Sequence, residues 1–80
     1  MYEYDKNIII LIDILLIENL VGSKTEFYDI IKSSRQTVSK IKKGINHFTP
    51  LQIAIICKKF NVNANWIFST EKNVFLTPKH

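Results

Sequence analysis

Signals for the start of a helix recur along this chain and divide it into short segments. Ser23 is followed three residues later by Glu26, the spacing of a capping box. Ser34 is a natural N-cap, and Thr49 precedes Pro50, a residue that suits the first turn of a helix. No alternating strand pattern bounded by hairpin signals occurs in the sequence. The sequence therefore predicts an all-α chain.

Five helices are expected between these signals. They span residues 7–20, 24–31, about 35–43, a fourth segment that starts at residue 50, and 64 to about 69. The first is rich in β-branched residues that would also suit a strand, but its apolar residues keep helical spacing: Ile9, Ile12, Leu16 and Leu20. Gly22 and Gly44 are expected to end the first and third helices. The fourth is expected to direct six residues to the core: Leu51, Ile53, Ala54, Ile56, Cys57 and Phe60.

Length and composition indicate one small domain, with a core over residues 8–70 and a C-terminal tail over residues 71–80. The apolar run at residues 8–17 contains Asp13 and falls short of the roughly 20 residues that a membrane-spanning helix needs. A single cysteine, Cys57, forms no internal disulfide. We therefore expect a cytoplasmic protein that has no membrane partner.

Catalytic and metal-binding classes find little support in the sequence. Its two histidines, one cysteine and scattered acids give no metal-ligand spacing and no nucleophile–base pair. A glycine-rich phosphate loop is also missing from the sequence. We expect neither an enzyme nor a bound cofactor or metal.

Charge is distributed unevenly along the chain. Residues 1–29 carry six acids and two lysines, a balance of −4, whereas residues 30–70 carry seven basic residues and no acid, a balance of +7. Such asymmetry in a small domain indicates a polyanionic partner. A basic surface that is only solvated is the alternative.

The third predicted helix is expected to carry part of this positive charge on its outer side. Val38 and Ile41 are three residues apart and mark one narrow buried stripe, which leaves most of the helix outside. The outer side then holds Arg35, Gln36, Ser39, Lys40 and Lys43, with Thr37 near its edge. Arginine pairs with guanine and glutamine with adenine in the major groove of DNA. A connection of two or three residues joins this helix to the preceding one, as in a helix-turn-helix.

At these residues the chain resembles a known family. Segment 23–44, SKTEFYDIIKSSRQTVSKIKKG, is similar to the helix-turn-helix of the Cro- and phage-repressor-like (Xre-type) DNA-binding family, and ten positions match in register: Ser23, Glu26, Phe27, Ile31, Ser34, Thr37, Val38, Ser39, Ile41 and Gly44. The similarity continues to Trp66, Ile67 and Phe68 and covers about residues 8–71. It implies a compact five-helix domain of the lambda-repressor-like type, in which Trp66 is expected to be largely buried.

The chain departs from the family pattern at several positions. Tyr28 stands where the family has alanine, and Lys32 and Ser33 stand where it has glycine followed by isoleucine or valine. Lys24 replaces the glutamine that opens the second helix, a change that keeps phosphate affinity. A turn rebuilt or extended by one residue is therefore expected between the second and third helices.

The residues and the resemblance together predict DNA contacts. Base contacts are expected from Arg35, Gln36, Ser39 and Lys40, although Ser39 also suits phosphate positioning and simple solvation is the alternative for the others. Phosphate contacts are expected from Lys24, Thr37, Lys43, Asn46 and His47, and a plain loop histidine is the alternative for His47.

The expected function is sequence-specific binding of double-stranded DNA by a transcriptional regulator. The resemblance implies a small bacterial or phage-encoded repressor of prophage or mobile-element type. The alternative is an antitoxin or adaptor that binds a protein partner such as a toxin or an antirepressor. A homodimer is also expected, through Ile67, Phe68, Val74, Phe75 and Leu76. The alternative for these C-terminal residues is that they fold back over the chain's own first helix.

Overall fold

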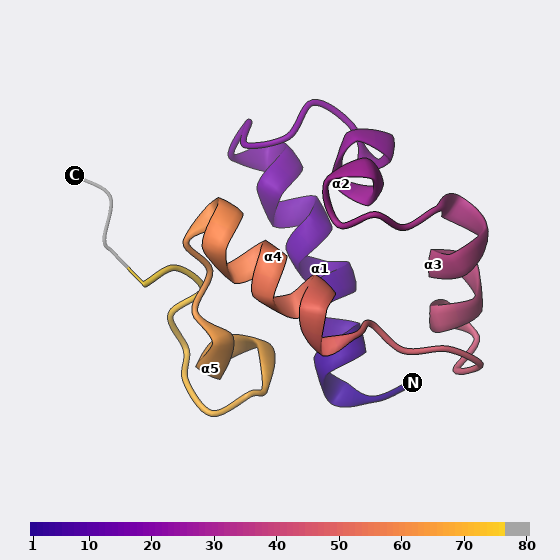
Figure 1. Cartoon of the computed structure of the whole chain (residues 1–80). Helices are drawn as coiled ribbons and strands as arrows, with labels where there is room; N and C mark the ends of the chain where they lie inside the picture. Colours follow the sequence, from indigo (N-terminus) through magenta and orange to yellow (C-terminus); the bar gives the residue numbers. More distant parts are fainter. Residues whose placement is uncertain (77–80) are drawn as a thin grey trace.

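The structure, a computed structural model, describes residues 1–76. It contains five helices: α1 (Glu3–Ile17), α2 (Lys24–Ile30), α3 (Arg35–Lys42), α4 (Pro50–Phe60) and α5 (Ala64–Ile67) (Figure 1). Within the described residues there is no strand, only an isolated antiparallel bridge between Val62 and Phe75. The predicted all-α class is confirmed.

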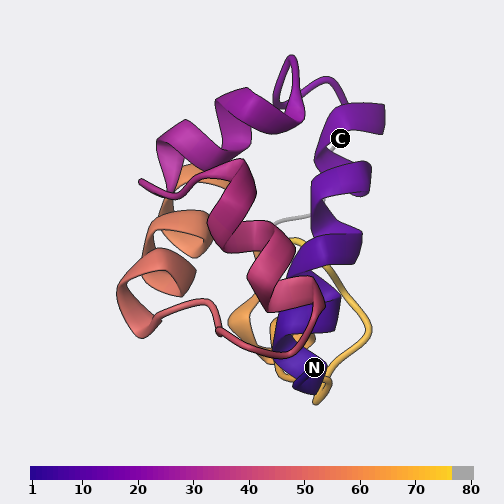
Figure 2. The same cartoon turned by 90° about the vertical axis from the view of Figure 1, so that its right-hand side faces the viewer.

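Helix α1 is the element around which the others pack. It contacts α2, α3 and α5, and Figures 1 and 2 show it running through the molecule beside them. Its buried apolar residues follow helical spacing: Ile8, Leu11, Ile12 and Leu15. Phe27 and Ile31 after α1, and Phe48 and Ile56 further along, complete a single apolar core.

Both ends of α1 differ from the sequence prediction. The helix begins at Glu3 rather than residue 7, with the acids Glu3 and Asp5 in its first turn, where they complement the helix dipole. It ends at Ile17, and Asn19 takes the left-handed conformation (φ 59°) that was expected near Gly22. Asparagine adopts this conformation more readily than most residues, so the helix ends before the glycine.

The other helices end in the same way as α1, with a residue in the left-handed conformation. Each of the five helices is followed by a residue with positive φ: Asn19, Lys32, Gly44, Asn61 and Ser69. After α3, Gly44 N–H donates to Ile41 O and Ile45 N–H donates to Lys40 O, both at 2.9 Å, the two hydrogen bonds of a Schellman motif. Each helix therefore stops abruptly, and the connections between helices remain short.

Three expectations about the core are wrong. Leu51 is 69% exposed and Ala54 is also exposed, because the side of α4 that carries them has no helix packed against it in the described chain. Trp66 is only partly buried, because the neighbouring Ile67 takes the core-facing position of the short helix α5. Ile67, in contrast, is completely buried.

The residues that follow α5 pair with the chain's own α4–α5 connection. Asn63 N–H donates to Val74 O at 2.7 Å, and Leu76 N–H donates to Asn61 O at 3.0 Å. The Asn63 side chain also donates to Asn73 O at 3.0 Å. Residues 73–76 therefore fold back on the molecule, although over the α4–α5 connection rather than over α1. Residues 77–80 lie outside the described part of the chain.

Lysine at position 32 generates a test of the helix closures. Lys32 has φ 57°, a conformation that costs a residue with a side chain about 1–2 kcal/mol and glycine much less. We expect Lys32→Gly to raise the free energy of unfolding by about 0.5–1 kcal/mol in chemical denaturation, after allowing for the greater freedom of glycine in the unfolded chain.

Lys43 provides the matched control, because it is an exposed lysine at the C-cap of α3 and has φ −86°. There glycine relieves no strain, and Lys43→Gly should lower stability by about 0.5–1 kcal/mol. Equal effects of the two substitutions would contradict the assigned backbone conformation at Lys32.

Candidate nucleic-acid interface

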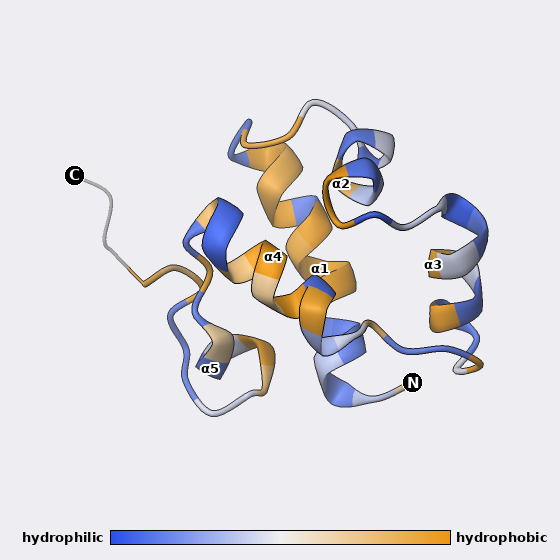
Figure 3. Ribbon diagram, in the orientation of Figure 1, coloured by the Kyte–Doolittle hydropathy of each residue, from blue (hydrophilic) through white to orange (hydrophobic). Residues whose placement is uncertain are grey.

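Helix α3 buries one narrow stripe and turns the rest of its surface outward. Val38 and Ile41 are fully enclosed, as predicted. Figure 3 shows the hydrophobic residues of α3 on the side that faces the molecule and hydrophilic residues on the opposite side. The Ser34 hydroxyl accepts a hydrogen bond from Thr37 N–H at 3.2 Å and so fixes the start of the helix.

The outward side carries the predicted base-reading residues together. Its exposed residues are Arg35, Gln36, Ser39, Lys40 and Lys43. Thr37 is half-buried at the edge, and its hydroxyl accepts a hydrogen bond from the Ser34 hydroxyl at 3.0 Å. Within residues 1–76 the single ion pair joins Asp5 and His47, so the cations of α3 have no acidic partner there.

The turn between α2 and α3 accommodates the unusual residues of this sequence. Lys32 takes the left-handed position, and Ser33 N–H donates to Tyr28 O at 2.8 Å. The Tyr28 ring is buried and lies edge-on to Phe27 with the ring centroids 6.4 Å apart. The Ser33 hydroxyl is buried without a hydrogen-bond partner among the described residues. A Schellman motif in this turn thus ends α2 and allows α3 to begin only a few residues later.

The loop that follows α3 is anchored by a buried carboxylate. Asp5 is completely buried, and its Oδ1 accepts a hydrogen bond from Phe48 N–H at 2.9 Å. Its Oδ2 lies 2.7 Å from His47 Nδ1. The His47 ring stacks on Tyr2, with centroids 3.8 Å apart and planes inclined by 12°. His47 therefore has a structural partner that the sequence analysis did not identify, because 42 residues separate it from Asp5.

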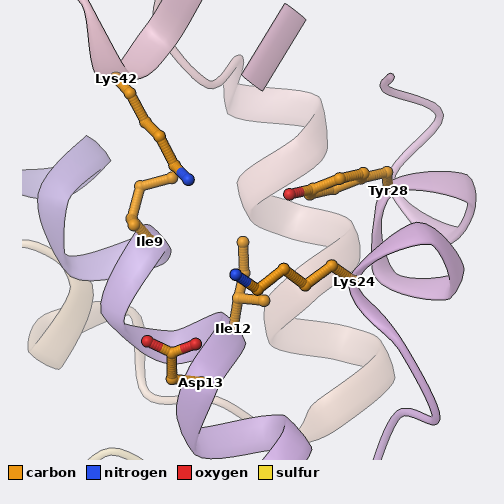
Figure 4. A pocket seen from close by; sticks show the side chains of 6 residues that line it. All are labelled: Ile9, Ile12, Asp13, Lys24, Tyr28 and Lys42. Carbon is orange, nitrogen blue, oxygen red and sulfur yellow. The ribbon is translucent and has the colours of Figure 1, made fainter. Parts of the chain in front are cut away.

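The remaining predicted phosphate contacts lie at the margins of this surface. Asn46 is half-buried in the α3–α4 loop. Lys24 is exposed at the first position of α2. Figure 4 shows its ammonium group directed into a pocket between α1, α2 and α3, where Lys42 joins it. No role was predicted for Lys42, which is exposed and is the last residue of α3.

The predicted dimer residues are not equally accessible. Phe68 is 49% exposed and Leu76 is 61% exposed, whereas Val74 and Phe75 are half-buried. Ile67 is enclosed in the chain's own core, so this conformation does not present it to a second copy. Ile67 is therefore not available as a surface residue for the predicted dimer.

An apolar groove runs along the open side of α4. It has a volume of about 500 Å³ and is lined by Tyr4, Phe48, Pro50, Ile53, Ala54, Cys57, Ala64 and Phe68. Burial raises the pKa of the Cys57 thiol, so this residue stays protonated and apolar at neutral pH. The lining contains no lysine, arginine, aspartate or glutamate.

The described residues also limit other kinds of site. No helix among them is both long and apolar enough to cross a membrane. Across residues 1–76, no group of three or more histidine, cysteine, aspartate or glutamate side chains is placed to hold a metal ion.

The Asp5 anchor generates a stability prediction. Asp5→Ala leaves the buried Phe48 N–H without an acceptor and His47 without its partner, so it should lower the free energy of unfolding by about 1.5–3 kcal/mol. Asp13→Ala is the control, because Asp13 is exposed on the same helix and should change stability by no more than about 0.5 kcal/mol. Equal losses in urea denaturation would show that the carboxylate is not an anchor.

Comparisons with known proteins do not assign the chain to a family. No protein-family model, no curated protein and no solved structure matches it. Its function must therefore be inferred from the surfaces described above.

Proposed function

We propose that the protein is a sequence-specific regulator of transcription that binds double-stranded DNA, a small repressor of prophage or mobile-element type. The observation that carries the proposal is the outward side of α3, which presents Arg35, Gln36, Ser39 and Lys40 to solvent. Arg35 has no acidic partner within residues 1–76, and neither has Lys40. Side chains of these types, on a helix that projects from the molecule, suit the major groove of DNA.

Specificity would come from the first turn of α3. Arg35 and Gln36 are its first two residues, and the N-terminal residues of a recognition helix are those that reach base edges. Arginine can donate two hydrogen bonds to guanine O6 and N7, and glutamine can pair with adenine N6 and N7. Lys40 and Ser39 lie one turn further along and would contact the neighbouring bases.

Affinity and register would come from phosphate contacts around α3. Lys43 is exposed at its end, Asn46 and His47 lie in the following loop, and Lys24 begins α2. Thr37 lies at the edge of the same surface. Contacts of this kind position a protein on DNA but carry little sequence information.

A homodimer is part of the proposal. One recognition helix covers few base pairs, whereas two copies read half-sites about 34–36 Å apart. Phe68 and Leu76 remain exposed, and Phe68 also lines the apolar groove beside α4. An uncharged surface suits contact between two copies of a chain whose net charge is +4.

The same groove favours a second candidate function. An apolar groove is also the type of surface that binds an amphipathic segment of another protein. An antitoxin or adaptor would use it to hold a toxin or an antirepressor. Such a protein would not need exposed Arg35, Gln36 and Lys40.

Selection of bound duplexes from a random pool tests the proposal. The recovered sites should contain two inverted half-sites with their centres about one helical turn apart. Arg35→Ala and Gln36→Ala should each cost about 1–3 kcal/mol on the selected site and relax the base preference at one position. Lys43→Ala should weaken binding to selected and random duplexes alike and lower the salt slope by about one.

Lys59→Ala controls for the loss of a positive charge, since Lys59 is exposed on α4 and has no proposed role. Identical effects of the Arg35, Gln36 and Lys59 substitutions would contradict base reading by α3. If no duplex is selected by the wild type and a co-purifying protein is still retained after Arg35, Gln36 and Lys40 are all replaced, the adaptor is favoured.

A further inference from the structure

Two lysine side chains from different helices enter one pocket beside α3. Lys24 is the first residue of α2, and Lys42 is the last residue of α3. The pocket has a volume of about 70 Å³ and is lined by Ile9, Ile12, Asp13, Lys24, Tyr28 and Lys42. In Figure 4 the Lys24 ammonium group and the Tyr28 hydroxyl point into this space from α2, and the Lys42 ammonium group points into it from the opposite side.

The pocket lies next to the proposed DNA-reading helix. Figure 2 looks onto α3, with α1 beside it and α2 above it, and the pocket is lined by residues of these three helices. A duplex held against α3 would therefore bring its backbone close to the pocket.

The polar groups of the pocket lack partners in the described chain. Neither Lys24 nor Lys42 forms an ion pair within residues 1–76, although the Asp13 carboxylate also lines the pocket. The Tyr28 side chain is buried, and no side-chain hydrogen bond within the same residues uses its hydroxyl. Lysines that only covered Ile9 and Ile12 would be expected to direct their ammonium groups outward to water. Here both ammonium groups instead point over the pocket, although the two lysines remain exposed residues.

We propose that this pocket binds a phosphate group of the DNA backbone. The ammonium groups of Lys24 and Lys42 would neutralise its charge, and the Tyr28 hydroxyl would donate a hydrogen bond to one of its oxygens. A volume of about 70 Å³ suits such a group, because one water needs roughly 10–15 Å³ of cavity and a phosphate carries four oxygens.

This inference rests on the proposed function and extends it. A phosphate bound by both Lys42 and Lys24 contacts α3 and α2 at the same time. Such a contact would fix the position of α3 along the major groove of the DNA. Asp13 opposes the negative charge of the ligand and weakens the binding of small free anions. The pocket would then be filled chiefly when the rest of α3 is docked on DNA.

Substitutions with opposite expected signs test the pocket. On selected and random duplexes alike, Lys42→Ala should weaken binding and lower the salt slope by about one. Tyr28→Phe, which keeps the buried ring, should weaken binding several-fold. Asp13→Asn should strengthen binding, because it removes the one negative charge of the pocket. Lys58→Ala on α4 is the matched lysine control and should change affinity least.

If Asp13→Asn fails to strengthen binding and Lys42→Ala behaves as Lys58→Ala does, the pocket is not a phosphate site, even though the protein binds DNA. That result would leave the proposed function intact. If no duplex binds the wild type, the proposed function fails, and a titration of the protein alone then decides whether the pocket binds phosphate.

Inorganic phosphate is the probe for that titration. Because Asp13 weakens the binding of free anions, millimolar phosphate should shift the amide resonances of Lys24, Tyr28 and Lys42 in the NMR spectrum more in Asp13→Asn than in the wild type, and not in Lys42→Ala. Phosphate-dependent shifts together with unchanged DNA affinity of Lys42→Ala would overturn the backbone assignment and indicate a free phosphorylated ligand. The absence of shifts, with Lys42→Ala again equal to Lys58→Ala on DNA, would overturn the site altogether.

Discussion

The buried carboxylate of Asp5 is the interaction on which the placement of the proposed interface depends. A buried charge is costly unless each of its oxygens finds a partner. Here one oxygen accepts the Phe48 N–H and the other lies against His47 Nδ1. These contacts tie the first turn of α1 to the loop between α3 and α4, so the end of α3 and the start of α4 are both positioned relative to the central helix.

Helix α3 gains its stability from its ends and its neighbours rather than from its own sequence. Eight residues are too few for a stable isolated helix in water, and only Val38 and Ile41 are buried. The Ser34 cap fixes its start, and the closure at Gly44 fixes its end. Because so few residues are needed for packing, the others are free to serve recognition. The proposed phosphate pocket uses the same arrangement, since it forms where α1, α2 and α3 meet.

Much of this arrangement follows from local signals in the sequence. Ser23, Ser34 and Thr49 cap α2, α3 and α4 as predicted, because an N-cap acts on amides only two or three residues away. The outward residues of α3 also follow from helical spacing alone.

Features that depend on distant contacts were not predictable in this way. The early start of α1 places Asp5 against His47, 42 residues away, and the burial of Ile67 depends on packing around α5. The convergence of Lys24 and Lys42 likewise needs the packing of three helices.

Protein NMR of the labelled chain with a selected duplex most directly tests the central claim that α3 reads DNA. We expect the largest shifts and solvent protection over residues 35–43 and at Lys24. Shifts concentrated instead along the apolar groove at Pro50, Ala54 and Phe68 would contradict DNA reading by α3.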